Sequence, residues 1–151
     1  MPTLLIVTTL GVGLVAGVWF AFSSFVTQGL NRAPEREAVI AMQGINQTAV
    51  TPVFMLAFLG TALLCVALIV WGGLNVSEAR AKLAIGGAAL YLVGSFVVTM
   101  AANVPLNNAL DRATPGPAAW EAYRAWLGWN HVRTVTGIAG FVLLLVALVN
   151  D

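Results

Sequence analysis

Two side chains suited to acid–base and anion chemistry lie close together near the C-terminus. The only histidine of the chain, His131, lies two residues before Arg133 in the stretch WLGWNHVRT, residues 126–134. An imidazole can accept a proton near neutral pH, and a guanidinium can hold an oxyanion. The pair therefore predicts a site where a base and an anion holder act on one ligand.

Four amide side chains accompany this pair. Asn103 and Asn107 lie four residues apart in AANVPLNNALDR and share one helix face, provided that the helix continues through Pro105. Asn130 immediately precedes His131, and Asn46 comes earlier in the chain, before a long apolar segment. These amides are candidate substrate-binding groups.

The elements that position these residues are membrane helices. Hydrophobic residues make up 60% of the 151 residues, charged residues 9%, and the mean hydropathy is +0.90. Crossing a hydrocarbon core takes about 20 apolar residues in a helix. Four stretches qualify, so we predict one all-α domain over residues 1–151, an integral membrane four-helix bundle in up-down-up-down order, with spans at about 3–26, 52–71, 83–102 and 132–149.

The connections between spans are unequal in length. The middle one is short, whereas the first and third are long and fall on the same side of the membrane in this topology. Each long connection is expected to contain a short interfacial helix, the first opened by Pro34 and the third written AAWEAYRAWLGW. Trp120, Tyr123, Trp126 and Trp129 recur every three residues in the third. All four amides are thus gathered at one end of the bundle.

Asn130 is a natural N-cap for the fourth span, which would place His131 and Arg133 in its first turn. A helix N-terminus carries partial positive charge, so basic residues there run against the usual preference. A bound anion would offset this charge, and the same field would favour the neutral imidazole. The competing interpretation is an aromatic belt at the membrane surface with one snorkelling arginine, in which Asn130 is only a cap.

The composition argues against several other classes of site. Cys65, the only cysteine, lies inside an apolar segment and is predicted to be a small buried hydrophobic residue. One His and one Cys do not build a zinc or copper site, so we expect no metal and no cofactor, although a haem bound through His131 stays open. The net charge of +1 argues against nucleic acid as a partner. Recurrent glycines, such as Gly13 and Gly17, suit close helix packing and equally suit a homo-oligomer.

The chain resembles the anthrone oxygenase family, small four-span membrane proteins formerly described as a domain of unknown function. The resemblance rests on the pairing of NVPLNNAL with W-x-x-Y-x-x-W-x-x-W-N-H-V-R-T. The residues that fit the pattern are Asn46, Asn103, Val104, Pro105, Asn107, Trp126, Trp129, Asn130, Arg133 and Thr134. The resemblance implies oxidation of a tricyclic phenolic anthrone by O₂ to an anthraquinone.

The roles that fit this chemistry are hypotheses about individual side chains. His131 would be the base, Arg133 with Asn103 or Asn107 would stabilise the enolate oxygen, and Trp126 and Trp129 would stack on planar rings; Asn46 and Asn130 complete the predicted site. The expected partners are a hydrophobic aromatic molecule and the bilayer, and the expected location is a bacterial inner membrane. The alternative is a non-catalytic membrane protein that binds a lipid, a quinone or a partner subunit through the same polar end.

Overall fold

The computed structural model describes residues 2–150, and these residues fold into four long helical rods and one shorter helix. The first rod is Pro2–Leu30, the second Pro52–Leu74, the third Ala79–Arg112 and the fourth Pro117–Val149. The elements in order are α1 (Pro2–Ala21), η1 (Phe22–Val26), α2 (Thr27–Leu30), α3 (Glu35–Ala49), α4 (Pro52–Leu74), α5 (Ala79–Leu90), η2 (Tyr91–Val97), η3 (Thr99–Asn103), α6 (Val104–Arg112), α7 (Pro117–Tyr123) and α8 (Ala125–Val149).

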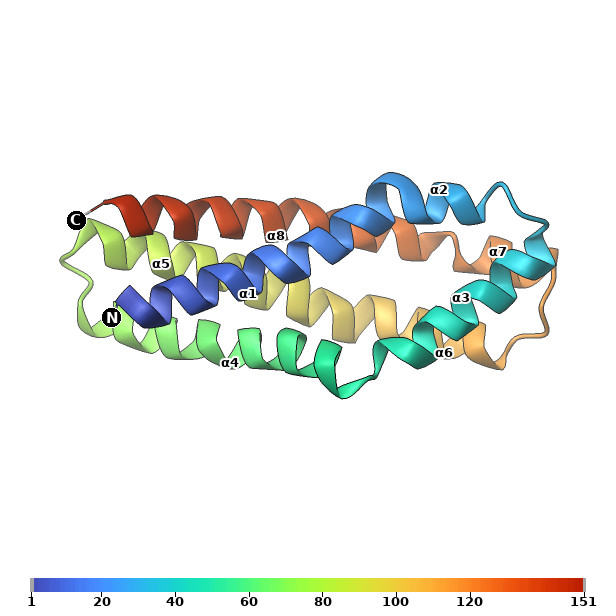
Figure 1. The fold of residues 1–151 in the computed structure, drawn as a ribbon, viewed down its shortest axis with the longest axis horizontal. Coiled ribbons are helices and arrows are strands. Elements are labelled where there is room, and N and C mark those ends of the chain that lie inside the picture. Colours follow the sequence, from blue (N-terminus) through green and yellow to red (C-terminus); the bar gives the residue numbers. More distant parts are fainter. Residues whose placement is uncertain (1, 151) are drawn as a thin grey trace.

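The rods form the expected antiparallel bundle. Figure 1 shows both ends of the chain at one end of an elongated molecule, with α2, α3, α6 and α7 at the other. Helix α8 packs on both α1 and α5, and α4 packs on the same two helices from the opposite side. All four rods are long and apolar enough to cross a membrane, so the protein is an all-α integral membrane bundle.

Three of the rods are longer than a bilayer requires. They contain 29, 34 and 33 residues, whereas the hydrocarbon core needs about 20. The extra turns all lie at the end away from the termini, where α3 packs on α6 and α7. This end has its own buried core, formed by Ala38, Val39, Met42, Leu110, Trp120, Tyr123 and Trp126. The polar end is therefore a folded extension of the bundle.

The helix expected in the first connection is α3, and it continues the bundle along its long axis in Figure 1. Pro34 precedes it and Glu35 and Glu37 occupy its first turn, where acidic side chains favour the helix dipole. Gln43 anchors it, because Nε2 donates to the carbonyl oxygens of Leu110 (2.8 Å) and Ala113 (3.2 Å) at the end of α6.

Two helices continue well beyond the predicted spans. The third rod continues through Pro105 to Arg112, because π-helical turns η2 and η3 precede the proline and widen the backbone where its ring must fit. The fourth rod begins at Pro117, with only a tight turn at Arg124 between α7 and α8. The polar and aromatic residues before position 132 belong to this rod because they pack on the second core.

Glycines set the closest helix contacts. A Cβ added to Gly87 would lie 2.8 Å from the carbonyl oxygen of Gly140, so α5 and α8 touch backbone to backbone there. Gly13 packs against the Phe141 ring, whereas a Cβ on Gly17 would meet nothing within 4 Å. Only the first residue of the predicted Gly13/Gly17 pair therefore serves packing within the bundle.

Candidate functional site

Arg133 is the centre of the polar site, and it is only 2% exposed. Nη2 donates to Asn130 Oδ1 at 2.6 Å, and Nη1 donates to Thr99 Oγ1 at 3.2 Å. The guanidinium carbon lies 3.8 Å from the centre of the Trp19 ring and 5.0 Å from that of Trp126. In the described part of the chain no carboxylate pairs with this cation. The charge is held by amide, hydroxyl and aromatic groups alone.

Asn130 connects this cation to the first rod. Its Nδ2 donates to the Trp19 carbonyl oxygen at 2.8 Å and to Ser23 Oγ at 2.7 Å, while its Oδ1 accepts from Arg133. The first of these bonds reaches a carbonyl in the turns just before η1, where α-helical bonding gives way to π-helical bonding. Both the side-chain oxygen and the amide nitrogen of Asn130 are thus used inside the bundle.

His131 lies outside the buried cluster but remains linked to it. Its side chain is exposed, and Nδ1 lies 3.0 Å from Ser23 Oγ. Ser23 Oγ also accepts from Asn130 and lies 2.8 Å from Thr134 Oγ1. A chain of hydrogen bonds therefore runs from the exposed imidazole through Ser23 and Asn130 to the buried guanidinium.

The other predicted amides separate into two places. Asn103 is fully buried beside the cation cluster, where its Nδ2 donates to the Trp126 carbonyl oxygen at 3.1 Å. Asn107 accepts from Tyr123 Oη at 2.7 Å, one turn farther along the third rod. Asn46 donates to Asp111 Oδ1 at 3.1 Å, in an exposed contact between α3 and α6. Only the first of these three amides reaches the surroundings of the cation.

The aromatic series on the fourth rod divides at Trp129. Trp120, Tyr123 and Trp126 are buried, with ring centres 6.0 and 5.6 Å apart along the series, whereas Trp129 is 46% exposed. A spacing of three residues falls short of a full turn, so the fourth ring rotates off the buried face. The structure thus places Trp126 against Arg133 and Trp129 on the outside of the bundle.

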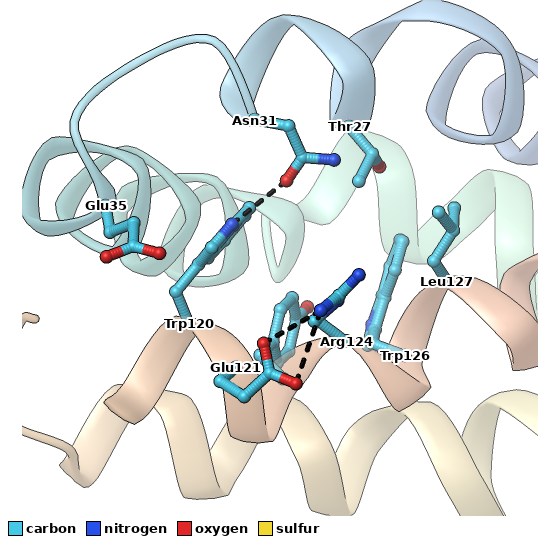
Figure 2. A pocket seen from close by; sticks show the side chains of 9 residues that line it. Thr27, Asn31, Glu35, Trp120, Glu121, Arg124, Trp126 and Leu127 are labelled. Atoms are coloured by element: carbon cyan, nitrogen blue, oxygen red, sulfur yellow. Dashed lines mark hydrogen bonds and ion pairs between the residues drawn. The ribbon is translucent and has the colours of Figure 1, made fainter. Parts of the chain in front are cut away.

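A cleft of about 310 Å³ opens beside this aromatic series. Figure 2 shows the Trp120 and Trp126 rings rising from α7 and α8 toward Thr27 on the first rod and Asn31 just after its end. Trp120 Nε1 donates to Asn31 Oδ1 at 2.9 Å across the cleft, and Arg124 pairs with Glu121 at 2.9 Å. The cleft is lined by Thr27, Asn31, Glu35, Trp120, Glu121, Tyr123, Arg124, Trp126 and Leu127.

The cleft and the polar cluster share a wall. Trp126 lines the cleft and also stands over the guanidinium of Arg133. His131 follows Leu127 by four residues, and Ser23 precedes Thr27 by four, so this hydrogen-bonded pair lies about one turn from the cleft, toward the end of the bundle that holds both termini. The cleft and the buried cation are therefore neighbours separated by the Trp126 ring, and neither His131 nor Arg133 lines the cleft itself.

The expected oxyanion site at the N-terminus of the fourth span was wrong. Asn130 is not an N-cap, because the helix containing it begins at Ala125 and follows α7 almost without interruption. The N–H groups near His131 and Arg133 are bonded within the helix and are not free to hold an anion. The positive character of this region comes from the Arg133 side chain.

Sequence reasoning missed three residues that complete the cluster: Trp19, Ser23 and Thr99. They come from the first and third rods, far from Arg133 in sequence. The only signal in the sequence was a polar or aromatic side chain inside an apolar stretch. Among residues 2–150, no group of three His, Cys, Asp or Glu side chains is placed to hold a metal ion.

The comparisons with known proteins point to one family. A family model described as anthrone oxygenase matches residues 53–143, more than half of the chain. No curated protein and no solved structure matches the chain. Asn103, Trp126, Asn130 and Arg133 lie inside the matched segment, whereas Trp19 and Ser23 precede it.

Proposed function

Because the chain belongs to the anthrone oxygenase family, we propose that it oxidises a planar phenolic, anthrone-like substrate with O₂. In this reaction the methylene carbon between two aromatic rings loses both hydrogens and gains one oxygen atom of O₂ as a carbonyl. The second oxygen atom leaves as water. The proposed location is a bacterial inner membrane, because a bilayer would supply so apolar a substrate.

The proposed first step is removal of one methylene proton, which leaves an enolate delocalised over the rings. This electron-rich anion passes one electron to O₂, the resulting carbon radical and superoxide combine into a peroxide anion, and the protonated base returns its proton to give the hydroperoxide. Loss of the second C–H proton with cleavage of the O–O bond then forms the quinone carbonyl and releases water. Both proton removals require a base, and the enolate requires a nearby positive charge.

The cleft is the proposed position of the substrate. Trp120, Tyr123 and Trp126 offer ring faces against which a planar tricycle can stack. A cleft of about 310 Å³ is within the usual range for small-ligand pockets, roughly 300–1,000 Å³. His131, about one helical turn from the cleft, is the proposed base. Ser23 Oγ lies 3.0 Å from its Nδ1 and orients the imidazole ring.

The observation that carries the proposal is the buried cation without a carboxylate. Burying a guanidinium is costly unless something uses its charge, and here only neutral groups surround it. A substrate that becomes anionic one aromatic ring away would be stabilised by this charge. Because the field acts only after proton loss, it lowers the barrier more than it strengthens ground-state binding.

A second candidate is a non-catalytic membrane protein that binds a lipid, a quinone or a partner subunit. Asn130 uses both ends of its amide on partners within the chain, and Asn107 and Asn46 are also bonded internally. A polar end that its own side chains satisfy to this extent resembles a structural feature. This candidate predicts binding of a planar ligand without acceleration of O₂ uptake.

The test is O₂ uptake together with quinone absorbance for the protein in lipid nanodiscs supplied with a hydroxylated anthrone. A reaction without protein measures autoxidation. We expect uptake well above autoxidation, a loss of about 10²- to 10⁴-fold in His131→Gln, and a loss of about 10²- to 10³-fold in Arg133→Met. Arg36→Met, which removes an arginine 68% exposed on α3, is the matched control and should leave the rate unchanged. Uptake equal to autoxidation would favour the binding protein.

A further inference from the structure

Three buried polar atoms of the site lack a hydrogen-bond partner. They are Asn103 Oδ1, Trp126 Nε1 and Arg133 Nε, and they are all the buried, unpartnered side-chain polar atoms in residues 2–150. Native proteins satisfy the great majority of such groups. Three exceptions confined to one site therefore indicate a ligand, not general imperfection of packing.

Asn103 and Arg133 both adjoin Trp126. Asn103 Nδ2 donates to the Trp126 carbonyl oxygen at 3.1 Å, and the Arg133 guanidinium lies 5.0 Å from the centre of the Trp126 ring. Thr99, the other partner of Arg133, lies one turn before Asn103 on the same rod. A single small molecule placed among them would be within reach of groups from both the third and the fourth rods.

The chemical character of these atoms is fixed by their other bonds. The indole Nε1–H and the guanidinium Nε–H can only donate. The Asn103 amide cannot be turned round, because its oxygen would then face the Trp126 carbonyl oxygen at the position where Nδ2 now donates. The site therefore presents two donors and one acceptor.

We propose that Asn103, Trp126 and Arg133 together bind the hydroxyl group of a small neutral molecule, which is water in the resting protein. A hydroxyl oxygen accepts from the two N–H donors, and its proton is donated to Asn103 Oδ1. Buried waters typically make about three such bonds. An anion such as chloride or superoxide would have no proton for the amide oxygen, and O₂ would also lack one.

This site is distinct from the cleft. Asn103 and Arg133 do not line the cleft, and Trp126 Nε1 has almost no exposed surface. Binding of a water molecule beside the buried Arg133 guanidinium does not depend on the proposed oxidation. It means that the guanidinium is balanced by a neutral dipole and not by a counterion.

The test is a rotating-frame Overhauser spectrum of protein carrying ¹⁵N-labelled tryptophan, reconstituted in lipid nanodiscs. We expect a direct cross-peak between the Trp126 indole proton and water, with a sign opposite to that of chemical exchange. The Trp19 indole, whose Nε1–H donates to Ser95 Oγ at 2.7 Å, is the internal control and should show no direct water contact.

Trp126→Phe assigns the signal, and if this variant does not fold, substituting the other four of the five tryptophans assigns it by elimination. Asn103→Leu should abolish the cross-peak, whereas Asn107→Leu should keep it. Absence of a direct water contact at Trp126 in the unsubstituted protein would overturn the proposal. A saturable shift of the Trp126 indole on titration with chloride or azide would do the same, since it would show that an anion occupies the site.

Discussion

Replacing Asn130 with leucine should weaken the bundle much more than the same change at Asn107. The two side chains are alike, and leucine has the same branched shape as asparagine but is larger, so neither variant opens a cavity. They differ in what they hold together. Asn130 makes three side-chain bonds, two to the first rod and one to Arg133, whereas Asn107 accepts one bond from Tyr123.

The magnitude follows from these bonds. Two neutral bonds contribute about 1 kcal/mol each, and the bond from the charged guanidinium contributes about 2 kcal/mol, so Asn130→Leu should cost about 4 kcal/mol. Bonds inside membrane bundles average about 0.6 kcal/mol, which sets a lower figure of roughly 2 kcal/mol. Asn107→Leu should cost about 1 kcal/mol or less.

The assay is reversible unfolding in mixed micelles, in which the fraction of denaturing detergent is raised and helix content is followed by circular dichroism. Both variants are compared with the unsubstituted protein under one set of conditions. Equal losses of unfolding free energy, or a larger loss for Asn107→Leu, would show that the network around Asn130 does not hold the rods together.

Four further substitutions test other parts of the fold. Gly87→Ala should cost about 1–3 kcal/mol in the same unfolding assay, because the new methyl meets the Gly140 carbonyl, whereas Gly17→Ala should be neutral or stabilising by up to about 1 kcal/mol; equal effects would contradict the packing described. Gln43→Ala should speed amide hydrogen exchange at the end of α6 by about tenfold, since it removes the bonds to two carbonyls there, and unchanged exchange would count against that role. Trp129→Ala should change the unfolding free energy in micelles by less than about 0.5 kcal/mol, and a larger loss would mean that its ring is buried in solution.

Composition and hydropathy were enough to predict the membrane bundle and its topology, because a bilayer demands long apolar helices and little else. They were not enough to predict where the rods end. The aromatic and charged residues before position 132 read as a separate interfacial helix. The structure contains this helix as α7, and it runs directly into α8 as part of the fourth rod, because α3 supplies a second core against which Trp120, Tyr123 and Trp126 pack.

The candidate site was partly predictable for the same reason. Asn103, Trp126, Asn130 and Arg133 stood out by type and spacing, and the structure brings them together. Whether Arg133 points inward or snorkels depends on its neighbours in space. The decisive neighbour is Trp19, near the other end of the sequence, whose ring packs against the Arg133 guanidinium. No local pattern around Arg133 indicates this contact.

The direction of His131 was likewise decided by a distant contact. Positions 130 and 131 of a helix point roughly a quarter-turn apart, so burying Asn130 against Trp19 turns His131 toward Ser23 at the bundle surface. Sequence periodicity does not distinguish between these two faces, because polar and aromatic side chains occur on both.

Exchange of the substrate's methylene hydrogens for deuterium, measured without O₂, tests the central claim most directly. In the proposed reaction the protein removes a proton before O₂ reacts, and anaerobic conditions eliminate autoxidation. An anthrone in D₂O with the protein in nanodiscs should exchange faster than in buffer with empty nanodiscs, and His131→Gln should remove the acceleration. Exchange no faster than with empty nanodiscs would contradict base-assisted enolate formation by this protein.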